Sequence, residues 1–253
     1  MQKTPITVVI LTDRFDTQFQ VAVKSAVFAQ EIIVVNNSKN SDEQKRANDL
    51  QNQFSFTLVH NTDKIDNFSK VKNKSLQLVK TDWVFFLDSD EVLPKSAQKE
   101  IDTLITTNIY DAVSIQRTDI FLQKKLQYGE TGTVYITKMF KKSKAKFVRN
   151  VHEVVQTTGK IGVADFKLLH YSHLSISHFL QKISFYSLLD SKNKMHSLKQ
   201  NYFEICIYPI GKFILNYFFK LGFLDGYRGL VYAFIMSLHS LFVRVYFYEK
   251  NIQ

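Results

Sequence analysis

The chain has 253 residues, 45% of them hydrophobic and 22% charged, so it can bury a core; a disordered chain and a disulfide-held miniature fold are excluded. Its 33 Lys and Arg outnumber its 23 Asp and Glu, and the net charge of +10 predicts an anionic partner such as nucleotide phosphate, anionic lipid or nucleic acid. Cys206 is the single cysteine and cannot form an intrachain disulfide, which favours a reducing, cytoplasmic compartment.

The first hundred residues alternate between predicted strands and predicted helices. Short apolar runs predict strands, and apolar residues at helical spacing predict helices. The expected strands are residues 6–12, 32–35, 54–59 and 83–87. The expected helices are residues 17–28, 42–53, 67–80 and 96–106. This alternation predicts an α/β fold with a mostly parallel sheet flanked by helices.

Polar residues lie at the ends of three of these strands. Thr12 ends the first strand, Asn36 follows the second, and Asp88 and Asp90 follow the fourth. Open parallel sheets bind ligands beyond the carboxyl ends of their strands, so the sequence predicts a ligand site where these ends meet.

Asp88 and Asp90 flank a single residue in the turn after a buried strand, so both carboxylates can reach one cation. Oxygen ligands suit Mg²⁺ or Mn²⁺, which keep waters and bind substrate phosphates. Such an ion would neutralise a leaving diphosphate. The alternative is a solvated turn, because Asp and Ser are common in turns.

The pattern is mixed after residue 108. Residues 112–117 and 134–140 are expected to be strands, and residues 175–189 a helix. A basic stretch without any acid runs from Lys138 to Arg149. A solvated surface and a surface for anionic lipid headgroups both stay open for it. No recognised nucleic-acid module accompanies the stretch, so we expect no nucleic-acid partner.

Residues 202–248 carry an excess of Phe and Tyr with scattered Lys and Arg, which predicts amphipathic helices at a membrane interface. A helical subdomain, or an association of subunits through these helices, is the alternative. No apolar run reaches the roughly 18–20 residues of a spanning helix, since residues 229–243 are bounded by Arg228 and Arg244. We expect a catalytic domain at residues 1–200 and a helical segment at residues 201–253, peripheral on the inner face of the cell membrane.

Five segments together resemble glycosyltransferase family 2: ITVVILT, EIIVVNNS, VKNKSLQLVKTDWVFFLDSDEVL, RNVHEVV and LLHYSHLS. They are collinear over residues 4–190, and they look most similar to bacterial lipopolysaccharide-core glucosyltransferase-like enzymes. The resemblance implies a GT-A, Rossmann-like fold, an inverting mechanism, a nucleoside-diphosphate-sugar donor (a UDP-sugar first) and Mn²⁺ or Mg²⁺. It further implies a glycan or lipid-linked acceptor in cell-surface polysaccharide or glycolipid biosynthesis.

The resemblance also assigns roles to individual residues. Asp88 and Asp90 match the family's D-x-D motif and would bind the metal, with His170 as a late addition to the metal shell. The donor-binding residues would be Thr12, Asn36, Lys72, Asp88, Arg149 and His152. Asn36 stands where the family usually has Asp, which leaves the donor nucleotide open.

An inverting transfer needs one general base, and Glu153 in the N-V-H-E-V segment is the candidate, with Glu91 as its rival. Glu153 and Asp90 are therefore the expected catalytic residues. His173 and His178 lie near His170 and suggest zinc, but no Cys or evident acidic partner accompanies them, which favours a structural role.

Two other functions stay open. The FFLDSDEV segment also fits the motif of haloacid-dehalogenase-like phosphatases, with Asp88 as nucleophile; three strand–helix units before it and the lack of a later acidic pair argue against this. A non-catalytic basic adaptor that binds membranes would explain the charge and the aromatic tail. It would leave the polar residues at three strand ends unexplained.

Overall fold

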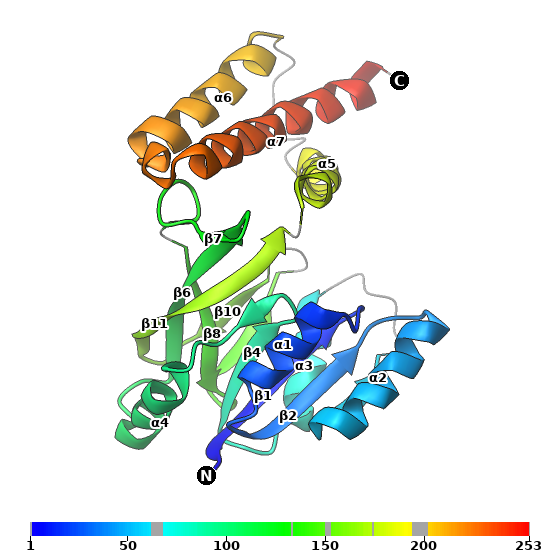
Figure 1. The fold of residues 1–253 in the computed structure, drawn as a ribbon, viewed down its shortest axis with the longest axis vertical. Helices are drawn as coiled ribbons and strands as arrows, with labels where there is room; N and C mark the ends of the chain where they lie inside the picture. Colours follow the sequence, from blue (N-terminus) through cyan, green and yellow to red (C-terminus); the bar gives the residue numbers. More distant parts are fainter. Residues whose placement is uncertain are drawn as a thin grey trace. The chain divides into compact units, whose positions relative to one another are not determined.

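The computed structural model describes residues 2–61, 68–132, 134–149, 153–173, 175–193 and 202–252. The chain forms two compact units (Figure 1). Unit 1 comprises residues 1–117 and 135–170, and unit 2 comprises residues 118–134 and 171–253. These units divide the chain differently from the expected boundary at residue 200, because residues 118–134 pack with the C-terminal helices.

Unit 1 begins with the predicted alternation of strands and helices, which is confirmed. Its parallel strands lie in the order β3-β2-β1-β4. They are β1 (Thr4–Thr12), β2 (Ala29–Asn36), β3 (Thr57–His60) and β4 (Trp83–Asp88). The helices are α1 (Thr17–Ser25), α2 (Ser41–Phe54), α3 (Phe68–Leu78) and α4 (Ala97–Thr107). The third strand is shorter than expected, because α2 continues to Phe54 and ends at Ser55 in the left-handed region (φ 53°).

The sheet continues in the order β4-β8-β6-β11-β5, with β8 antiparallel to both β4 and β6, and β5 antiparallel to β11. They are β5 (Glu91–Val92), β6 (Ala112–Phe121), β8 (Tyr135–Lys141) and β11 (Ile161–His173), with β7 (Lys124–Lys125) paired to β6. A separate two-stranded sheet is formed by β9 (Ala145–Val148) and β10 (Val154–Thr157). The fold therefore belongs to the predicted α/β class. The parallel strands of its sheet carry the candidate site residues at their carboxyl ends.

The side chains of β1 alternate between two apolar layers, as expected for a strand covered on both faces. Ile6, Val8 and Ile10 lie in a cluster with residues of α1, α2 and α4. Val9 lies in a second cluster, with residues of α3 and β9. Burial of both faces holds the carboxyl ends of the parallel strands in place, and these ends carry the polar residues.

Unit 2 is built around aromatic packing between the loop region 118–134 and the C-terminal helices. Its helical elements are α5 (Ile176–Asn193), α6 (Tyr202–Ile214), the π-helical η1 (Leu215–Phe219), the 3₁₀ turn η2 (Gly222–Asp225) and α7 (Tyr227–Ile252). The ring of Phe121 lies 5.8 Å from that of Phe179 and 5.7 Å from that of Tyr232. Edge-on aromatic pairs of this kind stabilise a core beyond the burial of their area.

Two carboxylates attach residues 118–134 to the C-terminal helices. Asp225 accepts hydrogen bonds from the backbone N–H groups of Gln127 and Tyr128 at 3.0–3.2 Å. Glu130 accepts from Lys212 at 2.6 Å and from Asn216 at 3.2 Å. Asn216 belongs to η1 and Asp225 to η2, so these contacts depend on the geometry of the turn between α6 and α7.

Gly229 offers a direct test of this turn. A Cβ at Gly229 would lie 1.8 Å from the backbone oxygen of Gly222, a distance that forces the backbone to shift. We expect Gly229→Ala to lower the free energy of unfolding by about 1–3 kcal/mol, the usual cost of overpacking. The matched control is Gly211→Ala in α6, where nothing lies within 4 Å of the added Cβ. Thermal unfolding of both variants tests this expectation, and equal unfolding midpoints would contradict the close approach of Gly229 to the Gly222 backbone.

Helix α7 is longer and more apolar than the sequence suggested. Its segment Tyr227–Lys250 is long enough to cross a membrane, and an 18-residue window within it has a mean hydropathy of 1.6, with 39% of that window buried within the protein. The expectation that no segment reaches this length is therefore wrong. Arg244 does not end the helix, because its guanidinium stacks 3.7 Å from the ring of Tyr208 and lies 3.9 Å from Glu204 of α6. Length and composition alone fit a core helix of unit 2 equally well.

Candidate active site

Three strand ends meet in unit 1 as the sequence predicts. Thr12 pairs in register with Asn36, and its neighbour Leu11 pairs with Asp88. The ends of β1, β2 and β4 therefore lie side by side, at the edge of the sheet where α/β proteins bind ligands.

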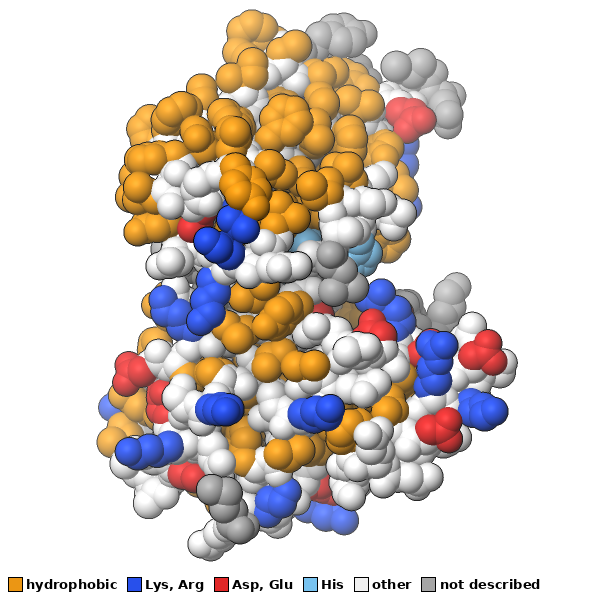
Figure 2. All heavy atoms as spheres, viewed as in Figure 1, with side chains coloured by type: hydrophobic (Ala, Val, Ile, Leu, Met, Phe, Trp, Pro, Cys, Tyr) orange, Lys and Arg blue, Asp and Glu red, His pale blue; other side chains and the backbone are white. Residues whose placement is uncertain are grey.

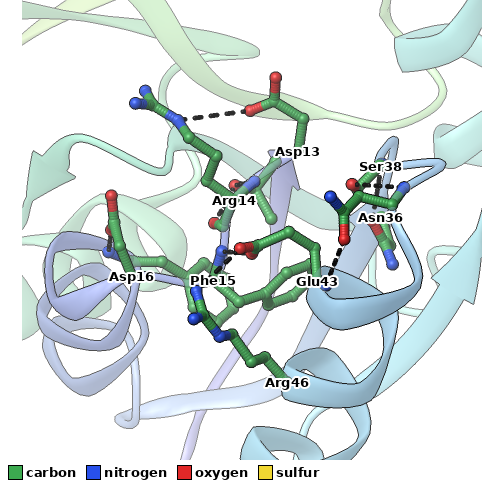
Figure 3. A network of polar contacts seen from close by, with 11 residues as sticks. Asp13, Arg14, Phe15, Asp16, Asn36, Ser38, Glu43 and Arg46 are labelled. Atoms are coloured by element: carbon green, nitrogen blue, oxygen red, sulfur yellow. Dashed lines mark hydrogen bonds and ion pairs between the residues drawn. The ribbon is translucent and has the colours of Figure 1, made fainter.

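Thr12 and Asn36 are buried, and their side chains make polar contacts next to the strand ends. Figure 3 shows Asn36 beside Ser38. The Thr12 hydroxyl donates to the backbone oxygen of Arg14 at 2.7 Å. The Asn36 side-chain oxygen accepts from Ser38 N–H at 2.8 Å, and its nitrogen lies 3.4 Å from His60 Nδ1. Both residues shape the loops at the site, and their assignment to the donor nucleotide stays a prediction.

The loop after β1 is also attached to α2 (Figure 3). The Glu43 carboxylate accepts from the backbone N–H of Phe15 at 2.7 Å and from Arg46 at 2.9 Å. Asp13, at the tip of the loop, has a side chain that is 73% exposed and lies 3.7 Å from Arg14. The loop thus presents an exposed carboxylate at the rim of the predicted site.

Asp88 is held by a lysine that comes from the antiparallel half of the sheet. The ammonium group of Lys138 lies 2.6 Å from Asp88 Oδ2 and 2.8 Å from Glu91 Oε2. Glu91 also accepts from the backbone N–H of Asp88 at 3.0 Å. Glu91 is fully buried and Lys138 is 5% exposed, so these two side chains form a buried floor under Asp88, whose side chain is 41% exposed.

The charges of Asp88, Glu91 and Lys138 shift one another's pKa values. Burial acts to raise the pKa of Asp88, but Lys138 and Lys72 outweigh it and hold that pKa well below its usual range. Burial dominates at Glu91 and raises its pKa, against the opposing charge of Lys138. Burial acts to lower the pKa of Lys138, but Asp88 and Glu91 raise it above its ordinary value. Lys138 is therefore a permanent positive charge at neutral pH, and Asp88 a permanent negative one.

The sequence analysis missed Lys138 as a site residue, because it is the first member of the basic stretch that reads as surface. The pairing of β8 with β6 shifts register between Thr137 and Met139, which leaves Lys138 without a partner on β6. A bulge of this kind redirects a side chain and is common next to active sites. The stretch is also not one continuous cationic surface, since Lys141 pairs with Asp111 at 2.9 Å. A Lys within the apolar segment Tyr135–Phe140 was the available signal.

Removal of the Lys138 charge should destabilise the protein in a pH-dependent way. We expect Lys138→Met to lower the free energy of unfolding by about 3–5 kcal/mol at pH 8, because it leaves the buried Glu91 carboxylate without its ion-pair partner. The pKa of Glu91 would rise further, and a group with a raised folded-state pKa contributes stability that is lost as pH rises. The loss should therefore be smaller at pH 5 than at pH 8.

Urea unfolding at the two pH values measures this difference. The control is Lys141→Met, which breaks the partly exposed pair with Asp111 and should cost no more than about 1 kcal/mol at either pH. An equal loss for Lys138→Met at both pH values would contradict the charge argument.

Asp90 lies beside His170, which β11 carries into the site through its pairing with β5. The distance from His170 Nε2 to Asp90 Oδ2 is 3.6 Å. A carboxylate oxygen and an imidazole nitrogen are both donors that Mn²⁺ accepts, and such ions complete their coordination with water and substrate phosphates. The pair therefore fits a divalent cation. Asp88 fits less well as a ligand, because Lys138 already contacts its Oδ2.

Within the described residues, no group of three or more His, Cys, Asp or Glu side chains lies together in a way that could hold a metal ion. The zinc hypothesis for the later histidines therefore gains no support. His173 instead stacks on Phe179, with ring centroids 3.5 Å apart, and this favours the structural role.

The predicted base lies opposite the predicted donor-binding lysine. Lys72 Nζ of α3 is 2.5 Å from Glu153 Oε1 and 3.9 Å from Asp88 Oδ1. Arg149 has an exposed side chain, and its backbone oxygen accepts a hydrogen bond from the Ser69 hydroxyl. The prediction for His152 lies outside the described residues. The structure thus brings together Asp88, Asp90, Lys72, Glu153 and His170, and it adds Lys138.

The fold resembles that of TarS from S. aureus. Residues 1–349 of TarS match with a TM-score of 0.51 at 13% identity, over 100% of this chain and 92% of that one. TarS 1–349 solved with UDP-GlcNAc matches with a TM-score of 0.50 at 13% identity, and the match covers 95% of this chain and 82% of that one. At this identity the likeness concerns the fold alone. Together with the sheet order, it shows a GT-A-like fold.

The family follows from the sequence. The model of glycosyl transferase family 2 matches residues 22–164, more than half of the chain, and the chain belongs to this family. The resemblance to this family is therefore confirmed, while closeness to the lipopolysaccharide-core enzymes stays a prediction. Membership favours a transferase over the phosphatase and adaptor alternatives.

Curated relatives include uncharacterized glycosyltransferases of Rickettsia. The Rickettsia prowazekii protein is 25% identical over 172 residues, covering 62% of this chain and 58% of that protein. The Rickettsia felis protein is 24% identical over 182 residues, covering 66% and 64%. The chain thus spans less than two thirds of the length of these relatives.

Proposed function

We propose that the protein is an inverting, metal-dependent glycosyltransferase that moves a sugar from a nucleoside-diphosphate sugar to a glycan or lipid-linked acceptor of the cell surface. The observation that carries the proposal is the convergence of Asp88, Asp90, Lys72 and Glu153 at the carboxyl ends of the parallel strands. The family supports it, as do the TarS structures that contain UDP-GlcNAc and UDP, which favour a UDP-sugar.

Each residue has a part in this reaction. Lys72 and Arg149 would bind the donor diphosphate, and Asp88, held by Lys138, would orient the donor at the strand end. Asp90 and His170 would hold Mn²⁺ or Mg²⁺, which when bound supplies positive charge for the leaving diphosphate. Glu153 would accept the proton of the acceptor hydroxyl. The oxygen of that hydroxyl would attack the sugar carbon from the face opposite the diphosphate.

Glu153 is a better base than Glu91 for a geometric reason. The Glu91 side chain is fully buried, and one of its oxygens is held by Lys138 and the Asp88 N–H. The Glu153 side chain is 20% exposed, and its carboxylate contacts Lys72 through Oε1. An acceptor hydroxyl can therefore approach Glu153, whereas it has no route to Glu91.

A panel of nucleotide sugars tests the proposal. The purified chain is incubated with UDP-, GDP- and dTDP-sugars and Mn²⁺, and release of the nucleoside diphosphate is measured with and without a membrane extract as acceptor source. We expect release from one nucleotide class, stimulated by the extract and abolished by EDTA. No release from any donor, together with no binding of any nucleoside diphosphate, would refute the proposal.

The surface of unit 2 supports a location at the membrane. Of the 30 large hydrophobic side chains that are exposed in the described residues, 21 lie in unit 2. Figure 2 shows hydrophobic side chains gathered over this unit, in contrast to the mixed charges over unit 1. Phe218 and Phe219 of η1 are 54% and 76% exposed. Lys220 directly follows Phe219 in the sequence and can contact anionic headgroups. We propose that this surface docks on the inner face of the cell membrane, where a lipid-linked acceptor would be reached.

Vesicle flotation tests the location. The full chain should bind phosphatidylcholine vesicles more strongly when they contain phosphatidylglycerol. Phe218→Ser with Phe219→Ser should reduce binding by about tenfold or more, since each buried aromatic side chain contributes about 1.5–3 kcal/mol. The matched control is Ile161→Ser with Val163→Ser, two exposed side chains of unit 1. Unchanged binding of the Phe variant would instead favour contact between copies of the chain.

A further inference from the structure

The proposed base is already paired in the structure without donor. Lys72 Nζ lies 2.5 Å from Glu153 Oε1, and the Lys72 side chain is only 11% exposed. An ion pair this short places the Lys72 ammonium group against Glu153 Oε1, an oxygen that would take the proton from the hydroxyl of the sugar acceptor. A proton transfer to Oε1 requires one of the two side chains to leave this contact.

The segment that carries Glu153 is attached to the helix that carries Lys72. Asn73 of α3 donates to the backbone oxygen of Phe147 and accepts from its N–H, both at 2.9 Å. Ser69 of the same helix donates to the backbone oxygen of Arg149. β9 pairs with β10, which begins directly after Glu153. Because these contacts hold the backbone near Glu153, the flexible Lys72 side chain is the partner that can move.

Lys72 has a second direction in which to move. Its ammonium group is 3.9 Å from Asp88 Oδ1 at the strand end that the donor would occupy. A bound diphosphate carries at least two negative charges, against one on the Glu153 carboxylate. The stronger field at the diphosphate would draw the ammonium group away from Glu153.

We propose that Lys72 exchanges between Glu153 in the donor-free enzyme and the diphosphate in the donor complex, so that donor binding frees the base. This inference rests on the proposed function. The exchange makes Glu153 available as a base only after the donor is bound. It therefore predicts that the acceptor hydroxyl is activated only in the donor complex. The contacts of Asn73 keep the freed Glu153 in place.

Binding of UDP to the full chain, measured by calorimetry with Mn²⁺ present throughout, tests the exchange. If Glu153 competes with the diphosphate for Lys72, Glu153→Gln should tighten UDP binding by about fivefold to tenfold, and Lys72→Met should weaken it by about tenfold. In the Lys72→Met background, Glu153→Gln should have no effect. With Lys72→Arg, which keeps the charge, the tightening by Glu153→Gln should return.

Simple charge repulsion between Glu153 and UDP makes a different prediction, because tightening would then persist in the Lys72→Met background. The matched control is Asp111→Asn, which breaks another carboxylate–lysine pair of unit 1 and should leave UDP affinity unchanged. Unchanged or weaker UDP binding by Glu153→Gln, or tightening that persists without Lys72, would overturn the exchange. Failure of the wild-type chain to bind UDP or any other nucleoside diphosphate would refute the proposed function itself.

Discussion

Replacement of Asp90 by Ala should abolish sugar transfer, with a loss in kcat/KM of about 10³-fold or more and no loss of the fold. Asp90 is one of the two residues proposed to hold the divalent cation, together with His170, whose Nε2 lies 3.6 Å from Asp90 Oδ2. Without its carboxylate, the positive charge that would stabilise the leaving diphosphate is no longer held in place. Mn²⁺ binding, measured by electron paramagnetic resonance, should weaken in parallel with activity. Thermal unfolding of the variant checks that the fold is kept.

The control for Asp90→Ala is Asp13→Ala, which removes an exposed carboxylate from the rim of the same strand ends. This variant should keep Mn²⁺ affinity and should change activity little. If Asp90→Ala retained wild-type activity and Mn²⁺ affinity, the assignment of the cation to Asp90 and His170 would be wrong.

Glu153→Gln should lower kcat by about 10²- to 10⁴-fold, the usual contribution of a general base. The amide keeps the size of the side chain and cannot take the acceptor proton. Because Lys72 loses its competing carboxylate, UDP affinity should not fall. Single-turnover kinetics with saturating donor separates the chemical step from binding.

Glu91→Gln is the informative comparison, since Glu91 is the rival base. It should affect stability more than kcat, because Glu91 is fully buried under the D-x-D turn with Lys138. A loss in kcat for Glu91→Gln that exceeds the loss for Glu153→Gln, with folding intact, would exchange the two roles.

The fold of the first hundred residues was predictable because local patterns determine it. Apolar runs such as ITVVILT mark strands buried on both faces, and the alternation of strands and helices leaves few topologies. The position of Asp88 beside Thr12 and Asn36 follows from the same parallel register. The boundary of α2 and β3 was less predictable, because Phe54 fits the apolar pattern of either element.

The contacts that define the site's electrostatics could not be predicted from the pattern. Lys138 reaches Asp88 only because β8 pairs with β4 and β6 and is shifted in register at that residue. A basic stretch in the sequence gives no information on such a bulge. The pairing of Lys72 with Glu153 joins residues 81 positions apart, and it depends on the contact of α3 with β9.

The path of the chain between the two units has a practical consequence for dissecting the protein. β6 and β11 each begin in unit 1 and end in unit 2, so the backbone passes between the units three times. Truncation at residue 200 would leave Phe121 and Leu126 without Tyr232 and Ile235, their partners in the core of unit 2. Such a fragment should precipitate or bind hydrophobic dyes, whereas the full chain should not. The proposed catalytic and membrane-binding functions are therefore better separated by point substitutions than by cutting the polypeptide.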